Sequence, residues 1–199
     1  MNEEMAWVAQ AQQGSDEAFT QLVETYQKHV YNLCYRMLGV PEAAEDAAQE
    51  TFLRAFQHLH RYDSRRPFGT WLLSIAAHYC IDRLRRRKFT MTSIEQNEDE
   101  GGTELPDADS PNPESEVIYS EQRQQMQVLL KRLDSVDRAA IVMRYWHDCS
   151  EVEIAESLNL TVSAVKSRLH RARRALAGFW QAETAPSNHE RRPHESPAF

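Results

Sequence analysis

The sequence predicts an all-α protein: two small helical domains joined by a flexible acidic linker, with a helix-turn-helix in the second domain. Apolar residues recur at helical spacing over long stretches, and the 199 residues include only 6 glycines and 8 prolines. Acidic residues gather in one central stretch that has few large apolar side chains. We therefore expect domains at residues 1–88 and 114–180, a linker at 89–113 and a disordered tail at 181–199.

The first helices are marked by their terminal residues. A short helix over Met5–Gln13 ends at Gly14, and the next starts at Ser15 or Asp16 and runs to Leu38. Gly39 then stops that helix, because glycine accepts the left-handed backbone of a helix end.

The third and fourth helices complete the first domain. Pro41 occupies the first position of the third helix, which reaches about His58. Its predicted inward stripe is Ala44, Ala48, Phe52, Ala55 and Leu59. A loop over 61–69 precedes the fourth helix, which Thr70 can cap and which ends in the basic run 83–88.

The charge is segregated along the chain. The net charge is −7, yet residues 89–122 contain ten acids and no lysine or arginine. Without those ten acids the rest of the chain carries −7 + 10 = +3. The acidic average therefore does not exclude nucleic-acid binding by the folded parts.

The end of the second domain has the signals of a helix-turn-helix. Ser150 and Glu153 form a capping box at the start of its first helix. Asn159 suits a left-handed turn, and Thr161 can cap a second helix over about Val162–Gly178. Its predicted buried stripe is Val165, Leu169, Ala172 and Leu176.

The other face of that second helix is basic. It holds Ser163, Lys166, Ser167, Arg168, His170, Arg171, Arg173 and Arg174. No acid occurs between Glu156 and Glu183, whereas an ordinary solvated helix usually mixes both signs. We expect base contacts in the major groove from Lys166, Ser167, His170 and Arg171, and phosphate contacts from Arg168, Arg173 and Arg174.

Two surfaces of the first domain are candidate interfaces. On the third helix, Leu53 lies among Asp46, Gln49, Glu50 and Arg54, which suits either a protein-binding hot spot or an ordinary exposed leucine. The fourth helix combines aromatic residues with the basic run 83–88. This combination suits single-stranded nucleic acid, although Trp71 and Tyr79 could equally be core residues.

Three motifs in this order resemble one family. Asp46–Phe56 is similar to the core-polymerase-binding segment of sigma-70 factors. Thr70–Leu72 followed by Ile81–Lys88 resembles the −10 recognition and melting segment of the extracytoplasmic-function (ECF) group. Glu153–Glu156 with Val165–Arg173 resembles the −35-reading module of that group.

The resemblance implies a role for each surface. Asp46, Gln49, Glu50, Leu53 and Arg54 would bind bacterial core RNA polymerase. The −10 contacts would be Tyr62, Arg65, Trp71, His78, Asp82, Arg85 and Arg86. The basic helix would read −35 promoter DNA, and the acidic linker would follow the RNA path of the polymerase. The resemblance also implies an anti-sigma partner, a stress- or envelope-responsive role, and a monomer when bound to polymerase.

The chain departs from the family pattern at three places. His78 stands where asparagine is common, which affects the expected −10 preference. Asn159 replaces a frequent glycine at the turn, and Asp134-Ser135 replaces a common Leu-Pro.

Two other functional classes compete with a sigma factor. A helix-turn-helix transcription regulator would share the basic helix but would not need the Asp46–Phe56 surface. An enzyme would need a nucleophile with its base, a metal cluster or a glycine-rich phosphate loop, and we identify no catalytic residue, metal site or cofactor motif.

Cys34, Cys80 and Cys149 are scattered and expected in the cores. With no signal peptide or membrane-length apolar run, we expect a cytoplasmic protein without membrane insertion.

Overall fold

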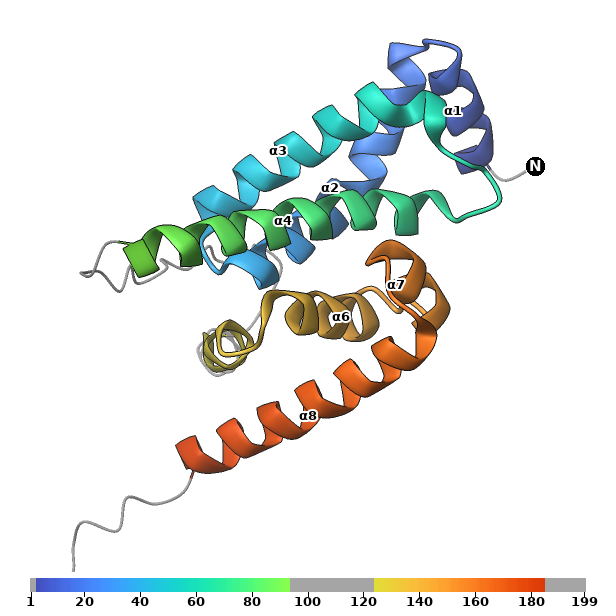
Figure 1. Ribbon diagram of the computed structural model, residues 1–199. Helices are drawn as coiled ribbons and strands as arrows, with labels where there is room; N and C mark the ends of the chain where they lie inside the picture. The colour runs from blue at the N-terminus through green and yellow to red at the C-terminus, as the bar shows by residue number, and fades with distance from the viewer. Residues whose placement is uncertain (1–2, 94–123, 185–199) are drawn as a thin grey trace, which may run out of the picture.

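The computed structural model describes residues 3–93 and 124–184, and all regular structure within these ranges is helical, which confirms the predicted class. The N-terminal lobe contains α1 (Glu3–Gln12), α2 (Asp16–Leu38), α3 (Pro41–His58), the 3-10 helix η1 (Leu59–Arg61) and α4 (Phe68–Ser93) (Figure 1). The C-terminal lobe contains a helix at residues 124–131, then α6 (Ser135–Trp146), α7 (Glu151–Ser157) and α8 (Val162–Thr184). Among the described helices, none is long and apolar enough to cross a membrane.

The ends of α2 are fixed by the predicted residues. The Ser15 hydroxyl accepts a hydrogen bond from the Ala18 amide at 3.2 Å. At the other end, Gly39 has a φ of 76° and its amide donates to the Tyr35 carbonyl at 2.7 Å. These two caps confirm the predicted bounds of α2 and place the whole 23-residue helix across the lobe.

The inward face of α3 differs from the prediction at two positions. Ala47 and Thr51 are fully buried, whereas the predicted Ala48 and Phe52 are only half-buried. Ala48 and Phe52 still pack against the core, so only the most buried line of α3 is displaced there, by one residue from the predicted stripe. Small side chains let α3 lie close to both α2 and α4, and the Thr51 hydroxyl is satisfied inside α3 by the Ala47 carbonyl at 2.7 Å.

Helix α4 is longer than predicted at both ends. The Trp71 amide donates to the Pro67 carbonyl at 3.1 Å, so the helix starts at Phe68 and Thr70 is not its cap. It continues five residues beyond Lys88, into the predicted linker, because no glycine or proline interrupts Phe89–Ser93. The rest of the predicted linker and residues 114–123 lie outside the described residues.

The helix-turn-helix forms as predicted. The Ser150 hydroxyl accepts from the Glu153 amide, and the Glu153 carboxylate accepts from the Ser150 amide at 2.8 Å. Asn159 adopts a φ of 54°, and the Thr161 hydroxyl caps α8 by accepting from the Ala164 amide at 3.1 Å. Helix α8 runs six residues beyond the predicted Gly178, to Thr184, and the remaining predicted tail lies outside the described residues.

The two lobes pack against each other, which the sequence did not predict. In Figure 1, α6 and α7 lie beside α2 and α4, and the buried residues of both lobes form one hydrophobic cluster. Arg138 of α6 is 5% exposed and donates to the Met37 carbonyl of α2 at 2.5 Å. Its other terminal nitrogen donates to Lys131 and Leu133 carbonyls within its own lobe. All three cysteines are buried thiols, as predicted.

The imidazole of His147 lies at this contact and makes the fold sensitive to acid. Burial is the main cause that lowers the pKa of His147 from 6.5 to about 4, with smaller contributions from His29 and Arg36 and an opposing one from Asp148. Neither ring nitrogen has a hydrogen-bond partner, and the ring centroid lies 6.3 Å from that of His29.

Because the folded state disfavours the charged imidazole, the stability from neutral His147 is complete above pH 6.5 and is lost as the pH falls towards 4. We expect the melting temperature of the wild type to fall more steeply across this window than that of His147→Gln, whose side chain does not titrate. Thermal melts at half-unit pH intervals test this. Parallel curves for the two proteins would contradict it.

Candidate nucleic-acid interface

Helix α8 presents a basic surface because its apolar stripe is buried. Val165, Leu169 and Ala172 are at most 4% exposed and pack against the other helices of the lobe. Leu176, the last member of the predicted stripe, is half-buried. Seven of the eight predicted DNA-contacting residues are exposed: Ser163, Lys166, Ser167, His170, Arg171, Arg173 and Arg174. The helix therefore offers cations and hydrogen-bond donors along one open face.

The surroundings of Arg168 do not fit the phosphate contact that the sequence predicts. Its guanidinium lies 2.5 Å from the Asp137 carboxylate of α6, and the two side chains are 29% and 18% exposed. This partly buried ion pair joins α8 to α6. A phosphate contact would require the guanidinium to leave Asp137, so we assign Arg168 to helix packing.

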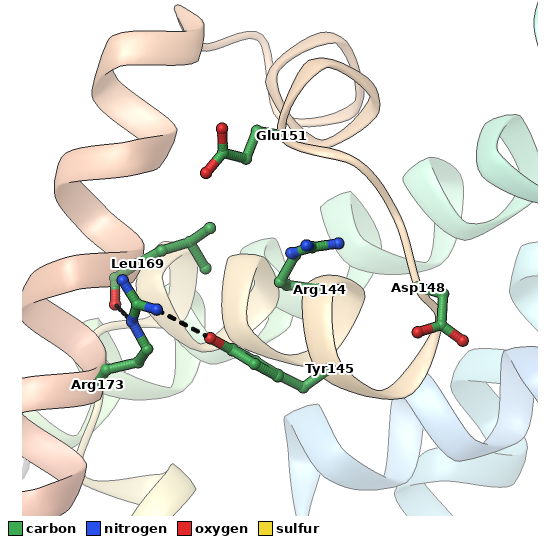
Figure 2. Close-up of a pocket in the computed structure, with 6 residues that line it drawn as sticks. All are labelled: Arg144, Tyr145, Asp148, Glu151, Leu169 and Arg173. Atoms are coloured by element: carbon green, nitrogen blue, oxygen red, sulfur yellow. Dashed lines mark hydrogen bonds between the residues drawn. The ribbon is translucent and has the colours of Figure 1, made fainter.

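A hollow of about 290 Å³ lies beside the basic face of α8, where α6, α7 and α8 meet (Figure 2). It is lined by Arg144, Tyr145, Asp148, Glu151, Leu169 and Arg173. Arg173 donates to the Tyr145 hydroxyl at 3.3 Å and to the Leu169 carbonyl at 3.3 Å. Arg144 donates to the Cys149 carbonyl at 3.1 Å. Two arginines from different helices thus flank one opening.

Arg144 and Tyr145 line this hollow but are not among the predicted DNA contacts. They precede the helix-turn-helix and therefore lie outside the predicted DNA-reading helix. The sequence feature that could have indicated these residues is the Arg-Tyr pair near the end of the helix that precedes the helix-turn-helix. Tyr145 is 51% exposed, and its hydroxyl contacts Arg173 on the basic helix.

Among the predicted −10 residues, Tyr62 is buried, whereas the others are half-buried or exposed. Tyr62 is 8% exposed, and its hydroxyl donates to the Arg66 carbonyl. Its ring packs on Phe68 and Trp71 with centroids 5.5 Å and 5.1 Å apart, and burial raises its pKa. Tyr62 therefore holds the loop in place, and its ring is not available to stack on a base without opening that core.

Four of the other predicted −10 residues follow one face of α4. Trp71, His78, Asp82 and Arg85 are spaced by seven, four and three residues, which places them on the same side of a helix. Trp71 and His78 are half-buried, whereas Asp82, Arg85 and the adjacent Arg86 are exposed. The His78 ring is oriented by a 2.8 Å contact between Nδ1 and the Ser74 carbonyl.

Arg65 lies in the loop before this face and is paired locally. Its side chain is 87% exposed and lies 2.7 Å from the Asp63 carboxylate, whose pKa it lowers to about 2. An exposed pair of this kind is worth little in water, so its guanidinium is available to another anion.

The predicted surface on α3 is exposed and ordered by ion pairs. Leu53 is 52% exposed. Glu50 and Arg54 are paired at 2.7 Å on one side of it, with the Arg54 guanidinium 4.9 Å from the centre of the Tyr79 ring. Asp46 lies 3.6 Å from Arg83 of α4, and Gln49 is exposed. Phe56, the last residue of the predicted segment, is 48% exposed beside this surface.

Comparison with known proteins explains why these surfaces occur together. Residues 22–90 match the family model for Sigma-70 region 2, and residues 123–176 match that for Sigma-70 region 4. The chain is 39% identical to the ECF RNA polymerase sigma factor SigW of Bacillus subtilis over 85% of this chain and 92% of that protein. It is 32% identical to RNA polymerase sigma factor CnrH of Cupriavidus metallidurans over 88% of this chain and 93% of that one.

Solved structures agree in fold. A structure of CnrH in complex with the cytosolic domain of CnrY matches with a TM-score of 0.65 and 27% identity, over 92% of this chain and 100% of that one. Sigma factor RpoE of Bartonella quintana, in complex with the anti-sigma factor NepR, has a TM-score of 0.66 at 18% identity, over 83% and 98% of the two chains, and shares the fold. The chain belongs to the ECF group of the sigma-70 family of RNA polymerase sigma factors.

Proposed function

We propose that this sigma factor binds bacterial core RNA polymerase through α3, melts the −10 element with the exposed face of α4, and reads the −35 element with α8. The observation that carries the proposal is the open face of α8, where exposed basic residues lie opposite the buried side chains of Val165, Leu169 and Ala172. The surface around Leu53 favours a sigma factor over a DNA-binding regulator, because an initiation factor must also hold the polymerase.

The base contacts are assigned to the first turns of α8, as in other helix-turn-helix proteins. Lys166, Ser167, His170 and Arg171 are exposed there and supply donors for base edges. Arg173 and Arg174 follow along the helix and supply phosphate contacts. Arg144 joins them, since it reaches the hollow beside Arg173.

On α4, a melted base would meet Trp71, His78 and Asp82, while Arg85 and Arg86 hold the backbone of the single strand. The chain needs no catalytic group for this work, because the polymerase makes RNA. It acts in the cytoplasm as a monomer on the polymerase, and an anti-sigma protein is a further partner, as NepR is for RpoE.

The test is reconstitution with purified components. The chain is mixed with sigma-free bacterial core polymerase and a pool of genomic fragments from its source, and new transcripts are sequenced. We expect the chain to co-purify with core and to direct initiation at a defined set of promoters. No activated promoter together with no co-purification would overturn the sigma assignment, and co-purification without initiation would overturn the assignments on α4 and α8.

A further inference from the structure

The last turns of α4 project beyond the hydrophobic core and carry one exposed aromatic ring. Among residues 68–90, Leu84 is the last that packs against the core cluster, and residues 85–90 are all exposed. In Figure 1 this end of α4 extends past the start of α3. Phe89 lies there and is 79% exposed, the highest value among the exposed large hydrophobic residues of the described chain. Packing in the core therefore does not explain a phenylalanine at this position.

Single exposed apolar side chains are common, so the position of Phe89 matters more than its exposure. Phe89 follows Asp82 by seven residues, Arg85 by four and Trp71 by 18. Because a helix has 3.6 residues per turn, 18 residues are about five full turns, and Phe89 points in the same direction as Trp71. Asp82 lies about 20° and Arg85 about 40° from that direction. Phe89 thus extends the face of α4 that carries the predicted −10 residues.

The charge around Phe89 suits DNA. Five of the six residues 83–88 are lysine or arginine, and no acid occurs between Asp82 and Glu95. Arg85 and Arg86 are exposed and precede Phe89 by about one helical turn. An aromatic ring binds the face of a base, while neighbouring cations bind the backbone phosphates. The combination therefore favours nucleic acid over an apolar protein surface as the occupant of this helix end.

The direction of the chain places the end of α4 towards the −35 element. The residues after α4 lead to the lobe whose α8 we propose to read that element, which lies upstream of −10. The seven residues from Asp82 to Phe89 span about 10 Å along the helix. This length corresponds to at most about three base-pair steps of 3.4 Å. Phe89 is thus within reach of the junction at which melted DNA returns to duplex on the upstream side.

We propose that Phe89 is a wedge that stacks on the base pair at the upstream edge of the melted −10 segment and stabilises the open junction. This inference rests on the proposed −10 role of α4. Melting removes the neighbour on one side of that base pair, and the ring of Phe89 covers the exposed face. An apolar side chain in this place offsets part of the cost of unstacking. Arg85 and Arg86 hold the backbone beside it.

The test uses holoenzyme assembled from the full chain and core polymerase, with fork-junction DNA from a mapped promoter. In this DNA the duplex that carries the −35 element continues into a single-stranded −10 segment. Phe89→Ala removes the ring, and we expect affinity for the fork to fall about 5- to 150-fold, the range for loss of one stacked base. Phe89→Tyr keeps a ring that can stack, and we expect it to bind the fork as wild type does.

The matched control is Met5→Ala, which removes an exposed apolar side chain from α1 in the same lobe. We expect it to bind the fork as wild type does. Binding to core polymerase and the melting temperature should be the same for all variants, since Phe89 projects from the core. A fall in core affinity for Phe89→Ala that accounts for its weaker fork binding would assign the ring to the polymerase and overturn the proposal.

A double-mutant cycle identifies the base pair that the ring contacts. Abasic residues replace both bases of one pair, and the replaced pair is moved one step at a time along the duplex next to the fork. We expect wild type to lose affinity when the pair at the edge is removed, and Phe89→Ala to lose little more. Equal losses for wild type and Phe89→Ala at every position would overturn the stacking contact.

The remaining outcomes separate this inference from the proposed function. Equal affinity of wild type and Phe89→Ala for the fork, or a loss in Phe89→Tyr as large as in Phe89→Ala, would overturn the role of the Phe89 ring and leave the −10 role of α4 intact. Failure of wild-type holoenzyme to prefer the fork over a duplex that carries only the −35 element would overturn the −10 role itself, and the wedge with it.

Discussion

Replacing Arg171 by glutamate is expected to reduce promoter-dependent initiation about 5- to 150-fold, the range for loss of one specific base contact, with the reversed charge favouring its upper end. Arg171 is exposed on the open face of α8, so the change should alter folding stability by no more than about 0.5 kcal/mol. Binding to core polymerase should not change, since α8 and α3 lie in different lobes.

The control for Arg171→Glu is Lys28→Glu, an equal change of charge at an exposed position of α2. It separates loss of a specific contact from a general rise in negative charge. Quantitative transcription from one mapped promoter gives the comparison. Equal losses for the two variants would mean that Arg171 contributes only through net charge.

Truncation of Leu53 to alanine is expected to weaken core binding by at least about 2 kcal/mol, or about 30-fold, which is the scale of a hot spot. Leu53 is half exposed between ion-paired neighbours, so little stability of the free chain depends on it. Met5→Ala removes a side chain of similar exposure from α1 and is the matched control. Titration of each labelled variant with core polymerase measures its affinity. Equal affinities of Leu53→Ala and Met5→Ala would mean that Leu53 is an ordinary exposed leucine.

Local features could be predicted from the sequence because their causes are local. The Ser150–Glu153 capping box, the left-handed Asn159 and the stop at Gly39 each depend on neighbouring residues, and all three are present. The buried stripe of α8 follows from helical periodicity alone, which is why its outward residues were predicted well.

Features that depend on distant partners could not be predicted in this way. Arg168 lies beside the basic face on a helical wheel, but its partner Asp137 is 31 residues away. Gln127 and Arg138 bind backbone carbonyls of α2, and no residue type marks such acceptors in a sequence. Tyr62 belongs to a polar loop, yet Phe68 and Trp71 bury it.

The net charge of the free chain disfavours DNA binding. A free chain with a net charge of −7 is repelled by DNA at long range. Polymerase binding would offset this repulsion, since holding the two lobes on one scaffold raises the effective concentration of each weak DNA contact.

The central claim is that polymerase binding and promoter reading belong to separate surfaces of the chain. It is tested most directly by titrating wild type, Leu53→Ala and Arg171→Glu into a fixed amount of core polymerase and measuring both bound chain and initiated transcripts. We predict that excess Leu53→Ala restores initiation as binding saturates, whereas Arg171→Glu saturates at the wild-type concentration and still fails to initiate. Identical loss of core binding by both variants would contradict the claim.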